Sequence, residues 1–297
     1  MAKSGTCPCY NKKVRIAIIG LGLIGGSIGL ALKQINELGW EIVGYVRRSE
    51  VAPVALKLGV VDRVEMNLEC AVKEADLVII ATPVLTIREI LSQIAHCLSP
   101  GCTITDTAST KLEVMKWAED LLPPTVDFVG GHPMAGKETY GIQVAEAELF
   151  QRCIYCLTPA DKTSPQAIEK VENIVRKLGA TPFFVDAQEH DNLVAGISHL
   201  PMLLSTALVS TTSRNASWDK LSTLAASGYH DLTRLASGNP EVNAHICLSN
   251  KQAIIHWIDE FTRELARYRQ LVDVGGKQLE EALAEANRAR REWLNGT

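Results

Sequence analysis

The stretch Val14–Ser27, VRIAIIGLGLIGGS, decides the fold of the chain. It begins as a short apolar run of branched side chains, which predicts a β-strand, and it leads into a helical pattern. The glycines between them suit a pyrophosphate. Gly20 allows a tight turn, Gly22 lets phosphates approach the backbone, and Gly25 lets helix and strand pack closely. This context favours a dinucleotide-binding turn over a glycine-rich turn without a ligand.

The type of dinucleotide is indicated by the end of the next predicted strand, Glu41–Val46. An acidic residue about 20 residues past the glycines usually holds a free ribose 2′-hydroxyl, whereas a 2′-phosphate needs arginine. The chain has Arg47 and Arg48 there, and no acidic residue in the expected place. We therefore predict that NADP is preferred over NAD. In the alternative, both arginines are solvated and Glu50 binds the ribose.

Strands and helices alternate over the first 187 residues. The further expected strands are 61–65, 76–82, 102–107, 127–130, 153–158 and 182–186. The further expected helices are 68–74, 86–98, 111–122 and 165–178. This alternation predicts an α/β fold with a Rossmann-like, doubly wound and mostly parallel sheet that has helices on both faces. The predicted cofactor contacts are Gly20, Gly22, Leu23, Ile24, Gly25, Arg47, Arg48, Thr82 and Pro83.

Three of the strand ends carry polar or turn-forming residues, at 81–83, 106–111 and 130–133. Ligands of such sheets bind outside the carboxyl ends of the strands, so we expect these three segments to meet in one crevice. His132 lies in the last segment, with glycines nearby, and Pro133 fixes the backbone directly after it. Because histidine titrates near neutral pH, His132 is a candidate acid or base. The alternative is a structural histidine in a tight surface loop.

Beyond residue 187 the spacing of apolar residues becomes helical, over 189–209, 218–236, 240–272 and 277–294. The fold class is therefore α/β followed by all-α. We predict a flexible tail over 1–13, a dinucleotide-binding domain over 14–187 and a helical substrate and dimerisation domain over 188–297. The helices of the second domain are long and apolar for its size, so they should bury surface against a second subunit in a homodimer.

Composition argues against several classes of protein. The net charge is −4 with a sequence pI of about 6.0 and there is no basic block, so nucleic acid and anionic membrane surfaces are not expected partners. No apolar run reaches the about 20 residues of a membrane span. The eight cysteines are scattered, mostly in apolar segments, which indicates a reducing, cytoplasmic location. No second cysteine pair or nearby histidine completes a zinc site, so no metal is expected.

Five motifs carry a resemblance to a known family. They are GLGLIGGS at 20–27, DTASTK at 106–111, GHPMAG at 131–136, SHLP at 198–201 and GYHDLTR at 228–234. In this order and spacing, over nearly the whole chain, they are similar to the prephenate/arogenate dehydrogenase family of tyrosine biosynthesis. The resemblance implies oxidative decarboxylation of a small ring acid. A hydride leaves the carbon bearing the 4-hydroxyl for the nicotinamide, the ring carboxylate departs as carbon dioxide, and the ring becomes aromatic.

The resemblance also implies roles for single residues. His132 would take the proton of the 4-hydroxyl, Ser109 would orient the reacting groups, and Arg234 would hold a substrate carboxylate. Substrate contacts are implied for Arg234, His199, Glu138, Gly228 and Asp231. Asp231 is expected to position Arg234 or a facing helix. In the alternative, Arg234 is a helix-surface arginine paired with Asp231.

The chain departs from the family pattern at two positions. Many prephenate-directed members have a histidine where this chain has Met202 and a tryptophan where it has Asn243, so arogenate is an alternative substrate. Lys137 either binds a carboxylate or faces solvent, and His190 is expected to cap or pack near the domain junction. The rival function, a non-catalytic dinucleotide sensor, would need neither the histidine nor the arginine of the motifs.

Overall fold

The computed structural model describes residues 13–35 and 39–296, and the chain packs as two compact units, residues 1–251 and 252–297. The predicted tail therefore lies outside the described residues, apart from Lys13. The predicted domain boundary after residue 187 falls inside the first unit and stays a prediction.

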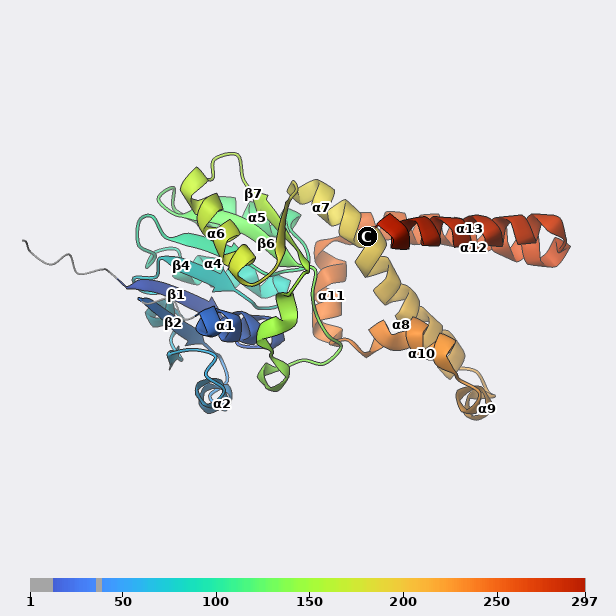
Figure 1. The fold of residues 1–297 in the computed structure, drawn as a ribbon, viewed down its shortest axis with the longest axis horizontal. Helices are drawn as coiled ribbons and strands as arrows, with labels where there is room; N and C mark the ends of the chain where they lie inside the picture. Colours follow the sequence, from blue (N-terminus) through green and yellow to red (C-terminus); the bar gives the residue numbers. More distant parts are fainter. Residues whose placement is uncertain (1–12, 36–38, 297) are drawn as a thin grey trace, which may run out of the picture. The chain divides into compact units, whose positions relative to one another are not determined.

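The first unit is built on one eight-stranded sheet with the order β3-β2-β1-β4-β5-β6-β7-β8 (Figure 1). The strands are β1 Val14–Ile19, β2 Trp40–Tyr45, β3 Arg63–Glu65, β4 Leu77–Ile80, β5 Thr103–Asp106, β6 Asp127–Pro133, β7 Ile154–Pro159 and β8 Thr181–Phe184. All neighbouring pairs are parallel except β6 and β7. The prediction of a mostly parallel sheet is therefore confirmed, and the strand order reverses between β1 and β4.

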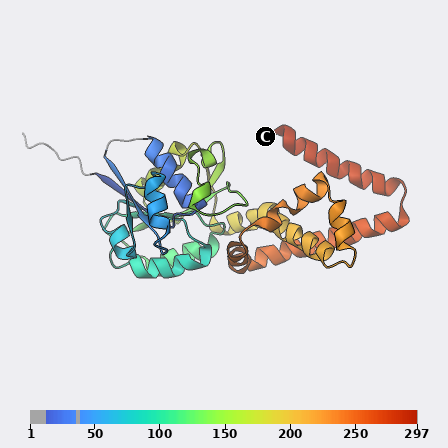
Figure 2. The same cartoon turned by 90° about the horizontal axis from the view of Figure 1, so that it is seen from below.

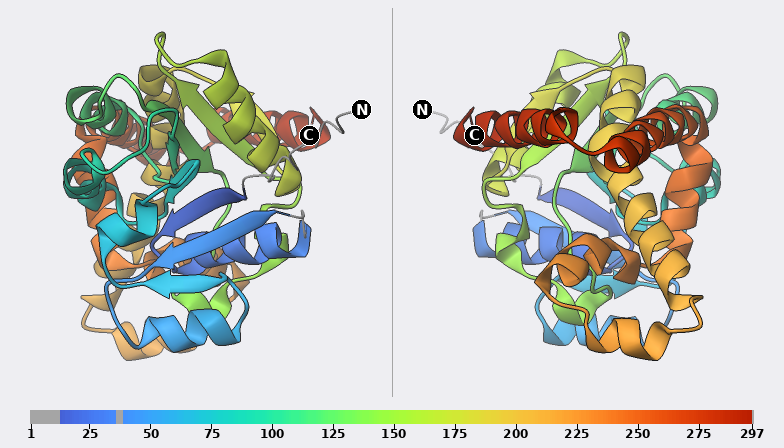
Figure 3. Two further views of the ribbon diagram at one scale, coloured as in Figure 1. Left: turned by 90° about the vertical axis from the view of Figure 1, so that its left-hand side faces the viewer. Right: turned by 90° about the vertical axis from the view of Figure 1, so that its right-hand side faces the viewer.

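Helices cover both faces of this sheet (Figure 3). One face carries α1 Leu23–Ile35, α2 Val51–Lys57 and α6 Pro165–Lys177, and the other carries α3 Leu68–Val72, α4 Ile87–Ile94 and α5 Leu112–Leu121. Successive side chains of a strand point to opposite faces, so Ile16 and Ile18 join the first core while Ala17 and Ile19 join the second. A strand buried on both faces needs a continuous apolar run, which β1 and β4 have.

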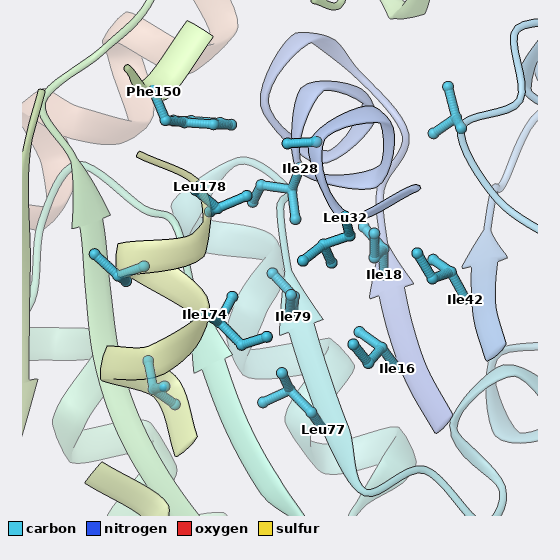
Figure 4. Packing of buried hydrophobic residues seen from close by; sticks show 14 of the residues in the cluster. Ile16, Ile18, Ile28, Leu32, Ile42, Leu77, Ile79, Phe150, Ile174 and Leu178 are labelled. Carbon is cyan, nitrogen blue, oxygen red and sulfur yellow. The ribbon is translucent and has the colours of Figure 1, made fainter. Parts of the chain in front are cut away.

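The first core is packed around α1 and α6. Ile28 and Leu32 of α1 lie over the β1 side chains, while Ile174 of α6 and Leu178, directly after that helix, approach the sheet (Figure 4). All four are nearly inaccessible to water. Burying one such side chain contributes about 1.5–3 kcal/mol, so this layer fixes the position of the β1–α1 turn.

Strand β6 is longer than its apolar residues predicted, because it continues through Pro133 instead of ending at Gly130. The extension pairs with β7 in antiparallel register, with His132 opposite Cys156. A local pattern of residues does not predict pairing with a strand that is distant in the sequence. Helix α2 and two 3-10 turns, Ile142–Val144 and Ala147–Phe150, were not predicted either.

The rest of the first unit is helical. It contains α7 Ala187–Val194, a π-helical turn Ala195–His199, α8 Leu200–Ser213, α9 Trp218–Thr223, α10 Ser227–Thr233, a 3-10 turn Arg234–Ser237 and α11 Pro240–Ser249. The helical stretch expected over 218–236, with a break at Gly228, is interrupted between Thr223 and Ser227 instead, so that Gly228 lies inside α10. The helix expected over 240–272 is interrupted at Asn250.

The continuous helical run Ala187–Ser213 is the one helix among the described residues that is long and apolar enough to cross a membrane. This composition is also typical of helices packed inside a protein. The run carries His190, Asp191 and His199, all buried and hydrogen-bonded within the first unit. Only 28% of its apolar 18-residue window is buried, and Leu193 and Ile197 are exposed, so packing within this chain covers only part of its apolar surface.

The second unit contains all of α12 Lys251–Val274 except its first residue, and α13 Lys277–Gly296, joined by a turn at Gly275 and Gly276 (Figure 2). Both glycines have a positive φ, which favours glycine over other residues. The Tyr268 hydroxyl donates a hydrogen bond to the carbonyl of Ala282. Many apolar side chains of these helices are exposed, among them Ile255, Ile258, Phe261, Leu265, Val272, Leu283 and Leu294.

Candidate active site

The glycine turn between β1 and α1 is shaped for close approach by a ligand. Gly20 has φ +94°, and a methyl group there would lie 2.6 Å from the Ala81 carbonyl oxygen. A methyl group on Gly25 would lie 2.0 Å from the Gly20 carbonyl oxygen. At Gly22, in contrast, nothing lies within 4 Å. The first and third glycines are therefore required by the fold, while the second leaves open space at the N-terminus of α1, where a pyrophosphate fits.

The turn after β2 lies beside this glycine turn, because the Gly20 N–H donates to the carbonyl of Tyr45. Arg47 and Arg48 follow and are exposed, and Arg48 is 3.8 Å from the carboxylate of Glu50. Thr82 follows β4, and its methyl carbon lies 2.7 Å from the methyl group that Gly20 lacks. The predicted cofactor residues from three segments thus surround the switch point of the sheet. They are suited to hold a dinucleotide there.

A buried ion pair joins the ends of β5 and β6. The Lys111 ammonium is fully buried, pairs with the Asp106 carboxylate and donates to the Gly131 carbonyl at 2.7 Å. The same carboxylate accepts from the Gly131 N–H at 3.0 Å and from the Ala108 N–H at 2.9 Å. Burial lowers the pKa of Lys111, and the Asp106 charge opposes that shift. This cluster locks the half-buried loop of Ser109 against the strand that carries His132.

The His132 imidazole is buried at the end of β6, and its Nδ1 lies 2.9 Å from Nε2 of His190. Burial holds the pKa of His132 well below its ordinary value, with smaller contributions from the charges of His190, Lys111 and His199. The ring is therefore neutral at pH 7. A neutral imidazole can accept a proton, as a general base must.

His199 lies in the π-helical turn between α7 and α8. Its Nδ1 is 3.3 Å from the Asn250 side-chain amide nitrogen, while its Nε2 is buried with no partner among the described residues. Burial lowers the pKa of His199 to about 4, against opposing effects of the Asp191 charge and of a hydrogen bond with the Ser109 backbone. A buried polar atom without a partner is unfavourable, and a ligand can satisfy it.

The segment after β6 carries two ion pairs. Glu138 pairs with Arg234 at the start of the 3-10 turn, and Lys137 pairs with Glu146 at 2.6 Å. The alternative pairing of Arg234 with Asp231 is not found among the described residues, because α10 ends at Thr233 and the arginine lies in the following turn.

The remaining predicted substrate residues are exposed. Asp231 and Gly228 lie on α10, and no atom approaches the position of a side chain on Gly228 within 4 Å. The glycine thus leaves space beside the turn that carries Arg234. No salt bridge of Asp231 is found in the described ranges.

Sequence reasoning missed three polar residues that support the site. Asp191, expected nowhere, accepts hydrogen bonds from the backbone N–H groups of Lys111 and Leu112 at 2.7 and 3.0 Å. His190 contacts His132 instead of only capping or packing at the domain junction. Asn250 donates to the Asp191 carbonyl at 2.7 Å. One sequence signal could have found these residues: a histidine followed by an aspartate in an otherwise apolar helix. Buried charged groups need partners, so such a pair predicts polar contacts inside the fold.

No group of residues suited to hold a metal ion is found in the part of the chain that the structure describes.

Two family models cover most of the chain. "Prephenate dehydrogenase, nucleotide-binding domain" matches residues 28–183, and "Prephenate dehydrogenase, dimerization domain" matches residues 186–287. The chain belongs to the prephenate dehydrogenase family. It is accordingly an oxidoreductase with a site for a nicotinamide dinucleotide.

Individual members of the prephenate dehydrogenase family are similar along nearly the whole chain. The prephenate dehydrogenase of Bacillus subtilis is 40% identical over 263 residues, which are 88% of this chain and 71% of the relative. The prephenate dehydrogenase of A. aeolicus, solved with hydroxyphenyl propionate and NAD+, is 29% identical with a TM-score of 0.88, covering 95% of this chain and 99% of that one. Arogenate dehydrogenase of Synechocystis is 29% identical with a TM-score of 0.79, covering 94% and 100%.

Proposed function

We propose that this member of the family catalyses the oxidative decarboxylation of prephenate to 4-hydroxyphenylpyruvate. The observation that carries the proposal is the buried, neutral His132 at the carboxyl end of β6, on the same edge of the sheet as the dinucleotide turn that follows β1. A dinucleotide sensor would not need a base there. The 40% identity to a prephenate dehydrogenase supports the same reaction.

In the proposed reaction, the bound nicotinamide supplies the hydride acceptor. His132 accepts the proton of the substrate 4-hydroxyl at Nε2 while the carbonyl develops. Ser109 orients that hydroxyl, and Arg234 binds a carboxylate, for which a planar guanidinium is better suited than an ammonium. Loss of carbon dioxide then leaves an aromatic ring. Lys111 and Asp106 contribute by holding the two loops in place.

Arogenate is the alternative substrate, which the arogenate dehydrogenase relative and the two departures from the family pattern support. Met202 is buried in α8, and Asn243 lies on α11, so neither position offers the ring or imidazole contact of many prephenate-directed members. Steady-state rates with prephenate and arogenate, measured side by side with NADP and NAD, test the proposal. A kcat/KM at least tenfold higher for arogenate would reverse the assignment, and no reduction with either acid would reject the activity.

We also propose that NADP is preferred. Arg47 and Arg48 are exposed beside the glycine turn, and a 2′-phosphate needs such cations. The A. aeolicus relative was solved with NAD+, which gives this preference no support. Arg47→Ala should lower kcat/KM for NADP and leave that for NAD unchanged, whereas the control Lys57→Ala should change neither. A clear NAD preference that persists in Arg47→Ala would reject the idea.

The proposed assembly is a homodimer in the cytoplasm. The match to the dimerization domain and the exposed apolar side chains of α12 and α13 support a second copy as the partner. The described cysteines are unpaired, as suits a reducing compartment. Sedimentation should give twice the chain mass at micromolar concentration, and a stable monomer would contradict the dimer. Fractionation of cells should recover the protein with the cytoplasm, and recovery with membranes would contradict that location.

A further inference from the structure

Helix α7 places two consecutive buried residues, His190 and Asp191, behind the candidate base. The Asp191 carboxylate accepts from the backbone N–H groups of Lys111 and Leu112, at the start of α5. A backbone N–H can only donate, so both carboxylate oxygens act as acceptors. One of them, Oδ1, also lies 2.8 Å from Nδ1 of His190. The carboxylate therefore requires that His190 carries its proton on Nδ1.

This arrangement fixes the proton on the next ring. In a neutral imidazole with Nδ1 protonated, Nε2 can only accept a hydrogen bond. Nε2 of His190 lies 2.9 Å from Nδ1 of His132, so Nδ1 of His132 must be the donor. His132 is thereby left with a bare Nε2, which is the form that can take a proton.

The backbone carbonyl of Asp191 determines, through Asn250, which nitrogen of His199 carries the proton. The Asn250 side-chain nitrogen donates to the Asp191 carbonyl at 2.7 Å, which identifies that atom as nitrogen and not oxygen. It can only donate to Nδ1 of His199, 3.3 Å away, so His199 carries its proton on Nε2. This Nε2 is the buried atom without a partner. It is a hydrogen-bond donor for which the backbone of Ser109, whose hydrogen bond raises the pKa of this ring, competes with a carbonyl, carboxylate or developing oxyanion of a ligand.

We propose that Asp191 sets the two active-site histidines in opposite tautomers, His132 as acceptor and His199 as donor, through His190 on one side and Asn250 on the other. His190 and Asn250 are positioning residues, because neither supplies the reacting atom. The pairing of one bare and one protonated Nε2 suits a hydroxyl that becomes a carbonyl. One ring removes the proton, and the other can stabilise charge on an oxygen of the ligand. The catalytic consequence rests on the proposed function, whereas the tautomers do not.

The tautomers can be read directly, without substrate, from the full chain labelled with 15N-histidine. Two-bond proton–nitrogen correlations distinguish protonated from bare ring nitrogens, and His132→Asn and His199→Asn assign the signals by their loss. The wild type should show His132 protonated at Nδ1 and His199 protonated at Nε2. Either ring in the opposite form at neutral pH would overturn the proposal. This result holds whether or not the chain oxidises prephenate.

Steady-state kinetics of His190 variants then test whether this residue positions the His132 ring or only packs against it. His190→Leu removes the acceptor for the His132 N–H, while His190→Gln keeps an amide oxygen at similar reach. Leu should lower kcat by about 10- to 10³-fold, within the range of acid–base effects, with KM changed less than about twofold. Gln should recover part of kcat. The control His96→Gln, at an exposed histidine paired with Glu69, should match the wild type.

The acid limb of the rate supplies a further readout. The groups around His132 are His190 and Asp191 from α7, Lys111 and Asp106 from the β5 loop, and His199. A hydrogen bond from Nδ1–H is stronger in the charged ring, so its loss lowers the pKa of His132, whereas loss of the His190 charge raises it. Leu and Gln both lack that charge and only Gln keeps an acceptor, so the acid limb should lie at lower pH in His190→Leu than in His190→Gln. Equal kcat values for Leu and Gln, or an acid limb at the same pH in both with the loss confined to KM, would reject the positioning role.

Discussion

Arg234 forms an ion pair with Glu138, and so a turn of the helical part of the first unit is joined to the loop that follows the strand of His132. The guanidinium is more than half exposed, which leaves it accessible to a ligand. A substrate carboxylate and the Glu138 carboxylate can compete for the same fork of donors, because both accept from it in the same geometry.

Arg234→Lys should therefore raise KM for the substrate and spare the cofactor. Lysine keeps the charge but lacks the planar fork of two donors, and one hydrogen bond to a charged group contributes about 1.5–3 kcal/mol, so we expect a rise of about 10- to 10²-fold. The measurement is KM for prephenate beside the dissociation constant of the dinucleotide. Arg176→Lys, on α6 and paired with Glu172, is the matched control. An unchanged KM for both acids would show that Arg234 does not bind the substrate.

His132→Asn should lower kcat by about 10²- to 10⁴-fold, since it removes a group that moves a proton in the transition state. Cofactor affinity should stay nearly the same, because the ring belongs to β6 and not to the glycine turn. Single-turnover reduction of the dinucleotide measures this directly. His96→Asn serves as the control at an exposed site. A loss below about fivefold would exclude His132 as the base.

The pH dependence of kcat/KM should have an unusually low acid limb. Protonated His132 cannot accept a proton, and burial holds its pKa well below the ordinary value of about 6.5. The active, neutral form therefore persists as pH falls, so the rate should stay constant down to about pH 6.5 and decline only below it. His199, with a pKa of about 4, also stays neutral over that range. A half-maximal rate at or above pH 6.5 would contradict the burial of the base.

Two glycines of the same turn should respond differently to alanine. Gly20→Ala places a methyl group 2.6 Å from the Ala81 carbonyl at φ +94°, so it should lower the free energy of unfolding by about 2–4 kcal/mol. Gly22→Ala meets no protein atom within 4 Å and should leave the thermal unfolding midpoint unchanged. It should instead weaken dinucleotide binding by about 10-fold or more, because the methyl group occupies the phosphate position. Equal effects of the two substitutions on stability would refute this division.

Local sequence was sufficient for most of the α/β part. Branched apolar runs with glycine between them identified β1 and its turn, and the alternation that followed predicted a mostly parallel sheet. Local sequence did not predict the length of β6. That strand extends beyond Gly130 only because it pairs with β7, which begins more than twenty residues later. The helices predicted after residue 213 were also too long, because the prediction again used only the local pattern of residues. Helical periodicity continues across the interruptions that capping and packing impose at Thr233 and Asn250.

The sequence by itself determined the site's ingredients: the glycine turn, a histidine after a strand, an arginine in a distant helical segment, and the resemblance that connects them. Only the tertiary structure decided which ring nitrogen of each histidine carries the proton. The proton of His132 is directed by His190 and Asp191, 58 and 59 positions further along the chain, and the free donor of His199 is directed by Asn250. A tautomer depends on which atom lies opposite a ring nitrogen, and no local pattern of residues specifies that.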